Sequence, residues 1–477
     1  MEISSLHELF LKNRTVSTDS RKIEKACLYF ALSGEHFNGN EFAVEALEKG
    51  ASYAIVDNPS LKEVAGCIYV KNTLETLQKL GTYHRNYCKA TVISLTGSNG
   101  KTTTKELIYQ VLQTTYKTIA TKGNLNNHIG VPLSLLNIKE DTEFAVIEMG
   151  ANHQKEIAFL CELAQPDFGC ITNFGKAHLE GFGGVQGVIK GKSELYEFLK
   201  AHHKTILYNC EDPIQTAAIR EYPYGVSFGN NQENTYQTNH LESNNTVSLA
   251  FQGTSIHTSL YGAYNITNCM IAASIGRFFD VEMNDIKYAI ETYEPNNNRS
   301  ELKKIGPHQV VLDAYNANPS SMEVAIKHFS NLSHPALKNK IVITSHQKPY
   351  YSPFISDHLQ SGKTIDLQTL WNKKWEGYLD INLTNYDQKH APSPEWVLGK
   401  SFQDSFSEYN FAICTDYEIQ YKLLKYDFYD IYNFDWESSP HFSTTKNVPS
   451  IESNITHVER EIIEYFGNNS YEQYFKF

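Results

Sequence analysis

The most regular pattern in this chain is a series of short, continuously apolar segments that alternate with segments of helical spacing. Continuous apolar segments are typical of strands buried on both faces of a sheet, because a half-exposed strand alternates apolar and polar residues. The pattern predicts strands at 27–34, 51–57, 90–95, 144–149, 168–174 and 308–314. It therefore predicts an α/β fold with mostly parallel sheets.

Apolar residues at helical spacing lie between these strands. Phe42, Ala43, Ala46 and Leu47 share one face of the segment 41–49, and Gly50 follows as a helix stop. The same pattern predicts helices that start near residue 321 and that cover about 456–466. A further strand is predicted at 410–414.

The composition changes near residue 340. All four tryptophans and 13 of the 30 tyrosines lie beyond that point, in less than a third of the chain. A length of 477 residues allows roughly two to four domains. We therefore divide the chain into residues 1–85, 86–305, 306–344 and 345–477.

Charge and cysteine content restrict the function classes. The net charge of −12 leaves no chain-wide basic field for nucleic acid or an anionic membrane. The eight cysteines are dispersed without metal-ligand spacing, which favours reduced thiols. The N-terminus has no signal-peptide pattern, and no apolar run reaches the roughly 20 residues that cross a bilayer. A soluble cytoplasmic protein is expected.

The segment after the strand 90–95 is typical of a phosphate-binding loop. It reads Gly97, Ser98, Asn99, Gly100, Lys101, Thr102 and Thr103, and a helical pattern follows. Glycines let backbone N–H groups surround phosphate oxygens, Lys101 reaches the β- and γ-phosphates, and Thr102 binds Mg²⁺. The loop is two residues shorter than the common GxxxxGK[ST] motif, and an ordinary turn is the alternative. A bound nucleotide is predicted.

Two other strands end in residues of similar chemistry. Ligands bind beyond the carboxyl ends of parallel strands, where Glu148 and the segment 173–178 would meet the loop. Glu148 would hold Mg²⁺ directly or through water, and the alternative is a solvated strand end. His178 would complete a metal shell or contact phosphate, and the alternative is an exposed loop residue.

The local pattern alone does not decide the role of two further sets of residues. The amides of Asn124, Asn126 and Asn127 suit either a ligand or a tight turn. Lys192 has the pattern of a surface lysine in a helix whose Leu195 and Phe198 face the core.

Together these motifs resemble the Mur ligase superfamily, and within it the MurF branch. The resemblance runs from about residue 19 to about residue 343. The motifs that carry it are DSRKIEKACLYFALSGEHFNGNEF, TGSNGKTTTKE, GNLNNHIGVPLSLL, IEMGAN, NFGKAHLEGFG, KGKSEL, YGAYNITN, NNRSE and LDAYNANPSSM.

The resemblance implies a three-domain plan. Residues 1–85 would bind the UDP part of the substrate, with Ser20 and Arg21 near it. Residues 86–305 would form a central P-loop ATPase domain with a mostly parallel sheet. Residues 306–344 would begin a Rossmann-like domain, and the Tyr- and Trp-rich residues 345–477 would make the C-terminal domain atypical.

The resemblance also implies site residues. Lys101, His178 and a CO₂-carbamylated Lys192 would be catalytic, and Thr102, Glu148, His178 and Lys192 would bind Mg²⁺. Asn126 and Asn127 would contact substrate. ATP would be bound by the loop together with Asn265, Asn268, Arg299 and Asp313.

The implied activity is ATP-dependent ligation of D-Ala-D-Ala to UDP-MurNAc-tripeptide through an acyl phosphate, by a monomer. KIVITSHQKPYYSPF (340–354) stands where the family has a second strand leading into an LGDMxELG motif, and nothing from about residue 345 to residue 477 matches the family. One alternative is therefore an ATP- and UDP-substrate-binding remnant fused to an unrelated interaction domain. Another is a folate-type polyglutamate ligase, which the DSR and GEHFNGN motifs disfavour.

Overall fold

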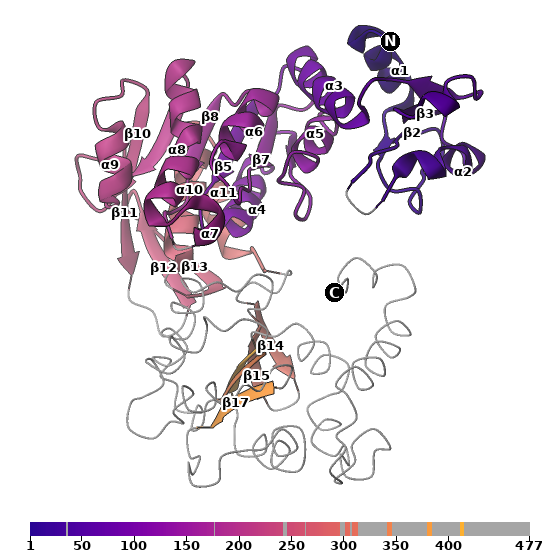
Figure 1. Ribbon diagram of the computed structural model, residues 1–477. Helices are drawn as coiled ribbons and strands as arrows, with labels where there is room; N and C mark the ends of the chain where they lie inside the picture. The colour runs from indigo at the N-terminus through magenta and orange to yellow at the C-terminus, as the bar shows by residue number, and fades with distance from the viewer. Residues whose placement is uncertain are drawn as a thin grey trace, which may run out of the picture. The chain divides into compact units, whose positions relative to one another are not determined.

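The protein is described by a computed structural model (Figure 1). The described residues are 1–34, 37–175, 177–241, 246–262 and 264–295, together with the backbone of five strands between 301 and 414. The chain divides into two compact units, the second of which comprises residues 242–247, 259–264 and 294–477.

The N-terminal region contains a four-stranded sheet in the order β1-β2-β3-β4, with every neighbouring pair parallel. The predicted strands 27–34 and 51–57 are confirmed as β2 and β3. The elements are α1 (Ile3–Asn13), β1 (Val16–Ser17), β2 (Leu28–Phe30), η1 (Gly39–Phe42), α2 (Ala43–Glu48), β3 (Tyr53–Val56), η2 (Pro59–Leu61), β4 (Cys67–Tyr69) and α3 (Thr73–Tyr87).

A nine-stranded sheet follows, in the order β13-β12-β11-β10-β9-β8-β5-β7-β6. All neighbours from β6 to β11 in this order are parallel, and β12 is antiparallel to β11. Its strands are β5 (Thr91–Thr96), β6 (Thr118–Ala120), β7 (Phe144–Glu148), β8 (Phe168–Ile171), β9 (Thr205–Asn209), β10 (Gly225–Gly229), β11 (Tyr236–Leu241), β12 (Thr246–Phe251) and β13 (Thr254–Tyr261). The predicted mostly parallel sheet is confirmed.

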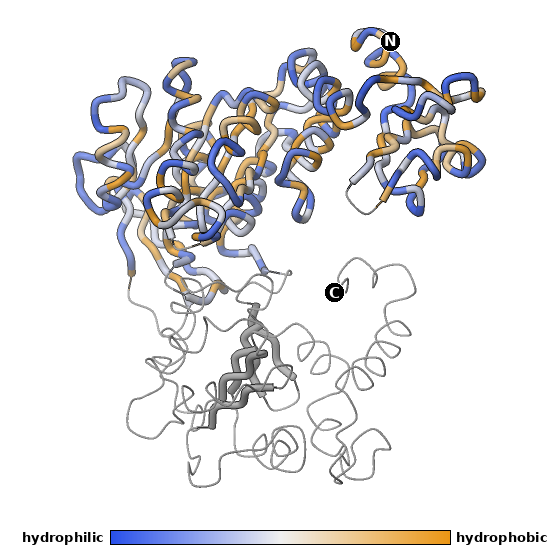
Figure 2. Tube along the Cα trace, viewed as in Figure 1, coloured by the Kyte–Doolittle hydropathy of each residue, from blue (hydrophilic) through white to orange (hydrophobic). Residues whose placement is uncertain are grey.

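Helices cover both faces of this sheet. Residues of α5, α6 and α8 form one buried cluster with β5, β7 and β9. On the other face, Phe278 and Phe279 at the end of α10 pack against Phe144 and Phe168. Figure 2 shows the apolar residues gathered along the central strands. The helices are α4 (Lys101–Leu112), α5 (Gly130–Leu135), α6 (Glu156–Ala164), α7 (Leu179–Phe182), α8 (Val185–Ala201), α9 (Pro213–Ile219), α10 (Tyr264–Phe278) and α11 (Met283–Glu291).

Helix α3 ties the N-terminal sheet to the nine-stranded sheet. It crosses the predicted boundary at residue 85 and packs against α5 and α6. The guanidinium of Arg85 donates to Asp167 at 2.7 Å and to the carbonyl of Ala164 at 3.0 Å. Arg85 is buried, and Asp167 directly precedes β8. This contact therefore holds α3 against the nine-stranded sheet.

A buried pair of histidines lies at the same junction. The Nε2 of His84 donates to the carbonyl of Ile138 at 2.8 Å, so its Nδ1 is left to accept from the Nε2 of His7 at 2.9 Å. Burial, and next the neighbouring His84, lower the pKa of His7 to about 4. Both rings are therefore neutral at pH 7.

This pair predicts an acid-sensitive contribution to stability. Unfolding returns the pKa of His7 to about 6.5, so its contribution is present above that pH and is lost as pH falls toward the folded value. We expect His7→Gln, which keeps a donor but does not titrate, to remove about 2 kcal/mol of the stability change between neutral pH and about pH 5. Urea denaturation at both pH values measures this, with the exposed His203→Gln as control. An unchanged pH dependence in His7→Gln would contradict it.

The second unit contains a five-stranded sheet in the order β14-β15-β18-β16-β17. The inner strand β18 is parallel to β15 and β16, and the two edge pairs are antiparallel. The predicted strands 308–314 and 410–414 are confirmed, and residues on both sides of the predicted boundary at 345 share this sheet. The strands are β14 (Glu301–Ile305), β15 (His308–Leu312), β16 (Ile341–Ser345), β17 (Leu379–Leu383) and β18 (Phe411–Cys414).

The helices predicted from residue 321 and at 456–466 lie outside the described residues. Across the part of the chain that is described, no helix combines the length and apolar character needed to cross a bilayer.

Candidate functional site

The loop between β5 and α4 needs both of its glycines. Gly97 has φ +151°, and a Cβ on it would lie 1.9 Å from the hydroxyl of Thr172. Gly100 has φ +78°, and a Cβ on it would lie 2.5 Å from Oδ1 of Asn268. Any side chain at either position would displace the loop, so the sequence motif corresponds to a tight backbone turn.

Helix α4 begins at Lys101, directly after Gly100. Its first turn has N–H groups without intrahelical acceptors and the positive end of the helix dipole, which together attract anions. The Nζ of Lys101 donates to the carbonyl of Gly97 at 2.8 Å, so the ammonium lies over the loop. Thr103 is buried in the same turn. The loop thus has the backbone and the cation of a phosphate site.

Glu148, at the end of β7, faces this loop. Its side chain is only 1% exposed, and its Oε2 accepts from the hydroxyl of Thr102 at 2.9 Å. Its Oε1 accepts from Nδ2 of Asn126 at 2.7 Å. Strands β5 and β7 are neighbours, and this register brings the predicted Mg²⁺ ligands Thr102 and Glu148 into contact.

The donor chemistry of this pair fits Mg²⁺. Within the described residues, the oxygens of Glu148 are hydrogen-bonded to a hydroxyl and an amide and not to a cation. A buried carboxylate is otherwise costly, and Mg²⁺ prefers one or two carboxylates completed by phosphate and water oxygens. No cluster of three or more His, Cys, Asp or Glu side chains suited to a metal lies in this part of the chain. The site therefore suits Mg²⁺ that arrives with phosphate.

Lys192 is buried rather than at the surface. Only 1% of it is exposed, its Nζ donates to the carbonyl of Ala151 at 3.3 Å, and it lies 5.0 Å from the ring centre of Phe182. Lys192, Leu195 and Leu199 form one stripe of α8, and this spacing is the sequence signal for its burial.

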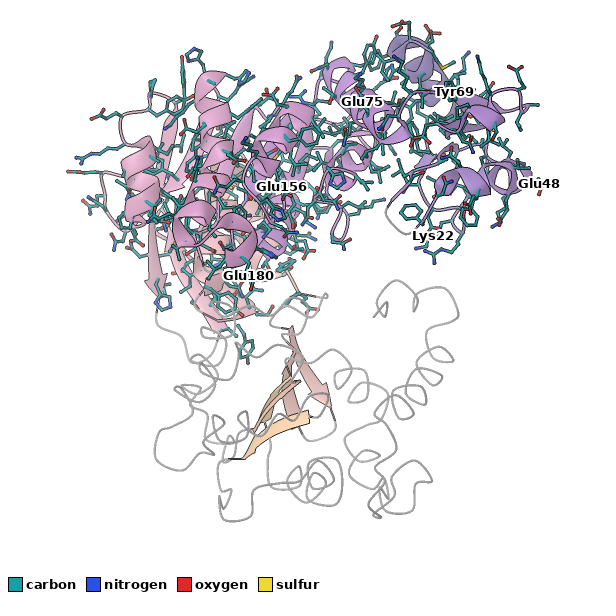
Figure 3. The ribbon with its side chains drawn as sticks, viewed as in Figure 1. Lys22, Glu48, Tyr69, Glu75, Glu156 and Glu180 are labelled. Carbon is teal, nitrogen blue, oxygen red and sulfur yellow. The ribbon has the colours of Figure 1, made fainter. Side chains whose placement is uncertain are left out.

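The electrostatic environment of Lys192 favours its neutral form. Burial, and next the charge of Lys101, lower its pKa from 10.5 to about 7. The carboxylates of Glu156 and Glu194 oppose that shift. Glu156 starts α6, and Figure 3 labels it together with Glu180 of α7.

The predicted asparagines have structural contacts. Oδ1 of Asn127 accepts from the N–H groups of Ile129 and Gly130 and so caps the start of α5. Asn268 is buried behind the loop, where its Oδ1 accepts from Thr104 at 3.0 Å and its Nδ2 donates to Asn265 at 2.8 Å. Contacts of Asn127 with substrate and of Asn265 and Asn268 with adenine stay predictions.

Of the remaining predicted residues, three lie in the described part of the chain and two lie outside it. His178 is exposed at the start of α7 with φ +53°. Arg21, more than half exposed, makes two hydrogen bonds to the carboxylate of Asp19, and the carbonyl of Ser20 accepts from Lys49. Arg299 and Asp313 lie outside the described residues. Their roles stay predictions.

The fold and the loop define a P-loop α/β protein, and comparison with known proteins places it more narrowly. The Mur ligase middle domain matches residues 95–276, and the Mur ligase family catalytic domain matches residues 13–85. The chain is 35% identical over 318 residues, 65% of this chain and 69% of the relative, to UDP-N-acetylmuramoyl-tripeptide–D-alanyl-D-alanine ligase of Bacillus subtilis.

A second relative, of the same name, comes from Escherichia coli. It is 33% identical over 321 residues, which cover 65% of this chain and 71% of that protein. The crystal structure of MurF from Acinetobacter baumannii is similar with a TM-score of 0.63 and 25% identity, over 86% of each chain. The chain therefore belongs to the Mur ligase family and, within it, to the MurF branch.

Proposed function

We propose that this chain is an ATP-dependent ligase that joins D-alanyl-D-alanine to UDP-MurNAc-tripeptide in peptidoglycan precursor synthesis. The observation that carries the proposal is the phosphate loop with Lys101 beside the buried Thr102–Glu148 pair, in a chain of the MurF branch. The substrates are small molecules, and we expect a cytoplasmic monomer.

The chemistry begins with a carboxylate that is a poor acyl donor, because its leaving group would be oxide. Transfer of the γ-phosphoryl group of ATP to the terminal carboxylate of the tripeptide gives an acyl phosphate and ADP. The amine of D-Ala-D-Ala then attacks the acyl carbon, and phosphate leaves with the former carboxylate oxygen. Amide formation is thereby coupled to ATP cleavage.

The residues of the loop support this reaction through position and charge. Lys101 and the first turn of α4 neutralise phosphate oxygens and align them with the acceptor carboxylate. Mg²⁺ held by Thr102 and Glu148 would supply further positive charge where negative charge develops. Asn126 holds the Glu148 carboxylate in place.

Other predicted residues would bind the UDP-linked substrate and the nucleotide. Arg21 is exposed and offers a cation for the UDP diphosphate, with Ser20 beside it. Asn265 and Asn268 would contact adenine, Asn126 and Asn127 the acceptor substrate, and Arg299 and Asp313 the nucleotide. His178 would reach the metal or phosphate when substrate is bound.

We further propose that Lys192 reacts with CO₂. The neutral amine nitrogen forms a bond to the carbon of CO₂ and releases a proton to solvent, which converts a cation into a carboxylate-like Mg²⁺ ligand. A lysine with a pKa of about 7 is half neutral at neutral pH, whereas an ordinary lysine is almost entirely charged. The burial and low pKa of Lys192 support this step.

Carbamylation predicts a defined pH dependence. As pH rises through about 7 the neutral fraction of Lys192 grows, so uptake of ¹³C-labelled CO₂ is expected to increase between about pH 6 and about pH 8. Carbon-13 NMR of the labelled protein measures it. Lys192→Ala should take up no label at this site, while the exposed Lys190→Ala on the same helix should match wild type. Equal labelling of both variants would contradict the assignment.

A coupled assay tests the ligase function. The purified full chain is incubated with ATP, Mg²⁺, UDP-MurNAc-tripeptide and D-Ala-D-Ala, and UDP-MurNAc-pentapeptide is measured by mass spectrometry. Pentapeptide formed in proportion to ADP supports the proposal. Binding of ATP and UDP-tripeptide without product would favour the remnant alternative. Product with folate and glutamate instead would favour the polyglutamate ligase.

A further inference from the structure

The chain segment after β8 holds the phosphate loop at Asn99. The side chain of Asn173 makes two reciprocal hydrogen bonds to this one residue: its Oδ1 accepts from the N–H of Asn99 at 3.1 Å, and its Nδ2 donates to the carbonyl of Asn99 at 3.0 Å. A carboxamide paired in this way fixes both the position and the direction of the Asn99 backbone. Sequence patterns alone place Asn173 only near the loop.

Neighbouring contacts join the same two segments. The hydroxyl of Thr172 donates to the carbonyl of Asn99 at 2.6 Å, and the N–H of Ser98 donates to the carbonyl of Asn173 at 3.0 Å. The hydroxyl of Ser98 donates to the carbonyl of Gly175 at 2.9 Å. The segment 172–175 thus binds both the backbone and the side chain of the loop's first half.

These contacts decide which loop groups face phosphate. The N–H groups of Ser98 and Asn99 donate to the backbone carbonyl and the side-chain Oδ1 of Asn173, so anion binding falls to the amides that begin α4 and to Lys101. A loop free to rotate at Asn99 would redirect the peptide that precedes Gly100. Preorganised donors bind a charged group without paying for reorganisation at the time of binding.

We propose that Asn173 is a positioning residue that holds the loop in its phosphate-binding conformation, with the Thr172 hydroxyl assisting. This inference rests on the proposed function, since it assigns Asn173 to the ATP site of that reaction. Asn173 acts through Asn99 and the loop backbone. Its loss should weaken binding of the nucleotide and leave binding of the UDP-linked substrate unchanged.

Substitutions at the two positions test this directly. Asn173→Ala removes both reciprocal bonds, Thr172→Val removes only a hydroxyl at nearly constant shape, and Thr172→Ser keeps that hydroxyl. We expect Asn173→Ala to raise the Kd for ADP by about tenfold or more and Thr172→Val by a smaller factor. Thr172→Ser should stay near wild type. The Kd for UDP-MurNAc-tripeptide should remain unchanged in all three, as measured by calorimetry.

A matched control separates positioning from stability. Gln215 is buried on α9 and hydrogen-bonds the carbonyl of Ile171 at the end of β8, but it does not contact the loop. Gln215→Ala should lower Tm without changing the Kd for ADP. If Asn173→Ala also lowers Tm and leaves the Kd for ADP unchanged, the residue is only structural and the inference is wrong. If wild type itself fails to bind ADP, the proposed function fails instead.

Discussion

Lys101→Ala is expected to lower kcat/KM for ATP-dependent ligation by about 10³-fold. The Nζ of Lys101 lies over the loop, 2.8 Å from the carbonyl oxygen of Gly97. Lys101 is also the first residue of α4. Charge that develops on the transferred phosphoryl group would lose this counter-charge. The loss should therefore appear in kcat as well as in binding, because the contact strengthens in the transition state.

Initial rates of pentapeptide formation at varied ATP measure this effect. Lys139→Ala removes an exposed lysine from the same domain and should behave as wild type. Circular dichroism and urea denaturation establish that the Lys101→Ala protein is folded. Activity within about tenfold of wild type would mean that Lys101 does not neutralise the phosphoryl group.

Glu148→Gln is expected to lower kcat by about 10²-fold and to raise the Mg²⁺ concentration needed for half-maximal rate. The substitution keeps the size of the side chain but removes the negative charge. The amide oxygen can still accept from the Nδ2 of Asn126, but the amide NH₂ then faces the hydroxyl of Thr102, which now donates to the carboxylate. That hydroxyl must turn to accept, and because a hydrogen bond to a charged group is replaced by a neutral one, Tm should fall slightly.

Magnesium titrations of the reaction rate distinguish these effects. A metal role predicts that added Mg²⁺ restores part of the activity of Glu148→Gln, whereas a purely structural role predicts a Mg²⁺ dependence like that of wild type. Glu162→Gln, an exposed carboxylate change on α6, serves as the control. An unaltered half-maximal Mg²⁺ concentration in Glu148→Gln would remove Glu148 from the metal site.

The sequence predicts much of this site because its determinants are local. Gly97, Gly100 and Lys101 are adjacent in the chain, and their spacing alone defines the turn and the helix start. The position of Glu148 beside the loop is also predictable, because the parallel strands β5 and β7 must bring their carboxyl ends to the same edge of the sheet. Continuous apolar strands likewise predict a sheet covered on both faces.

Contacts between distant segments lie beyond such patterns. Asn126 and Glu148 are partners because the chain after β6 returns over β7, and no local spacing encodes that path. Asn173 meets Asn99 only through the register of β8 on β5. Lysine is usually exposed, so residue type alone predicts that Lys192 lies at the surface. Its spacing from the apolar residues of α8 instead places it among the buried residues of that helix.

Isotope labelling of the tripeptide carboxylate tests the proposed acyl-phosphate reaction most directly. UDP-MurNAc-tripeptide labelled with ¹⁸O in its terminal carboxylate is converted with ATP, Mg²⁺ and D-Ala-D-Ala, and the released phosphate is analysed by mass spectrometry. Ligation through an acyl phosphate predicts one ¹⁸O atom in each phosphate and one phosphate for each pentapeptide. Unlabelled phosphate, or ATP cleavage without pentapeptide, would contradict the proposed ligase.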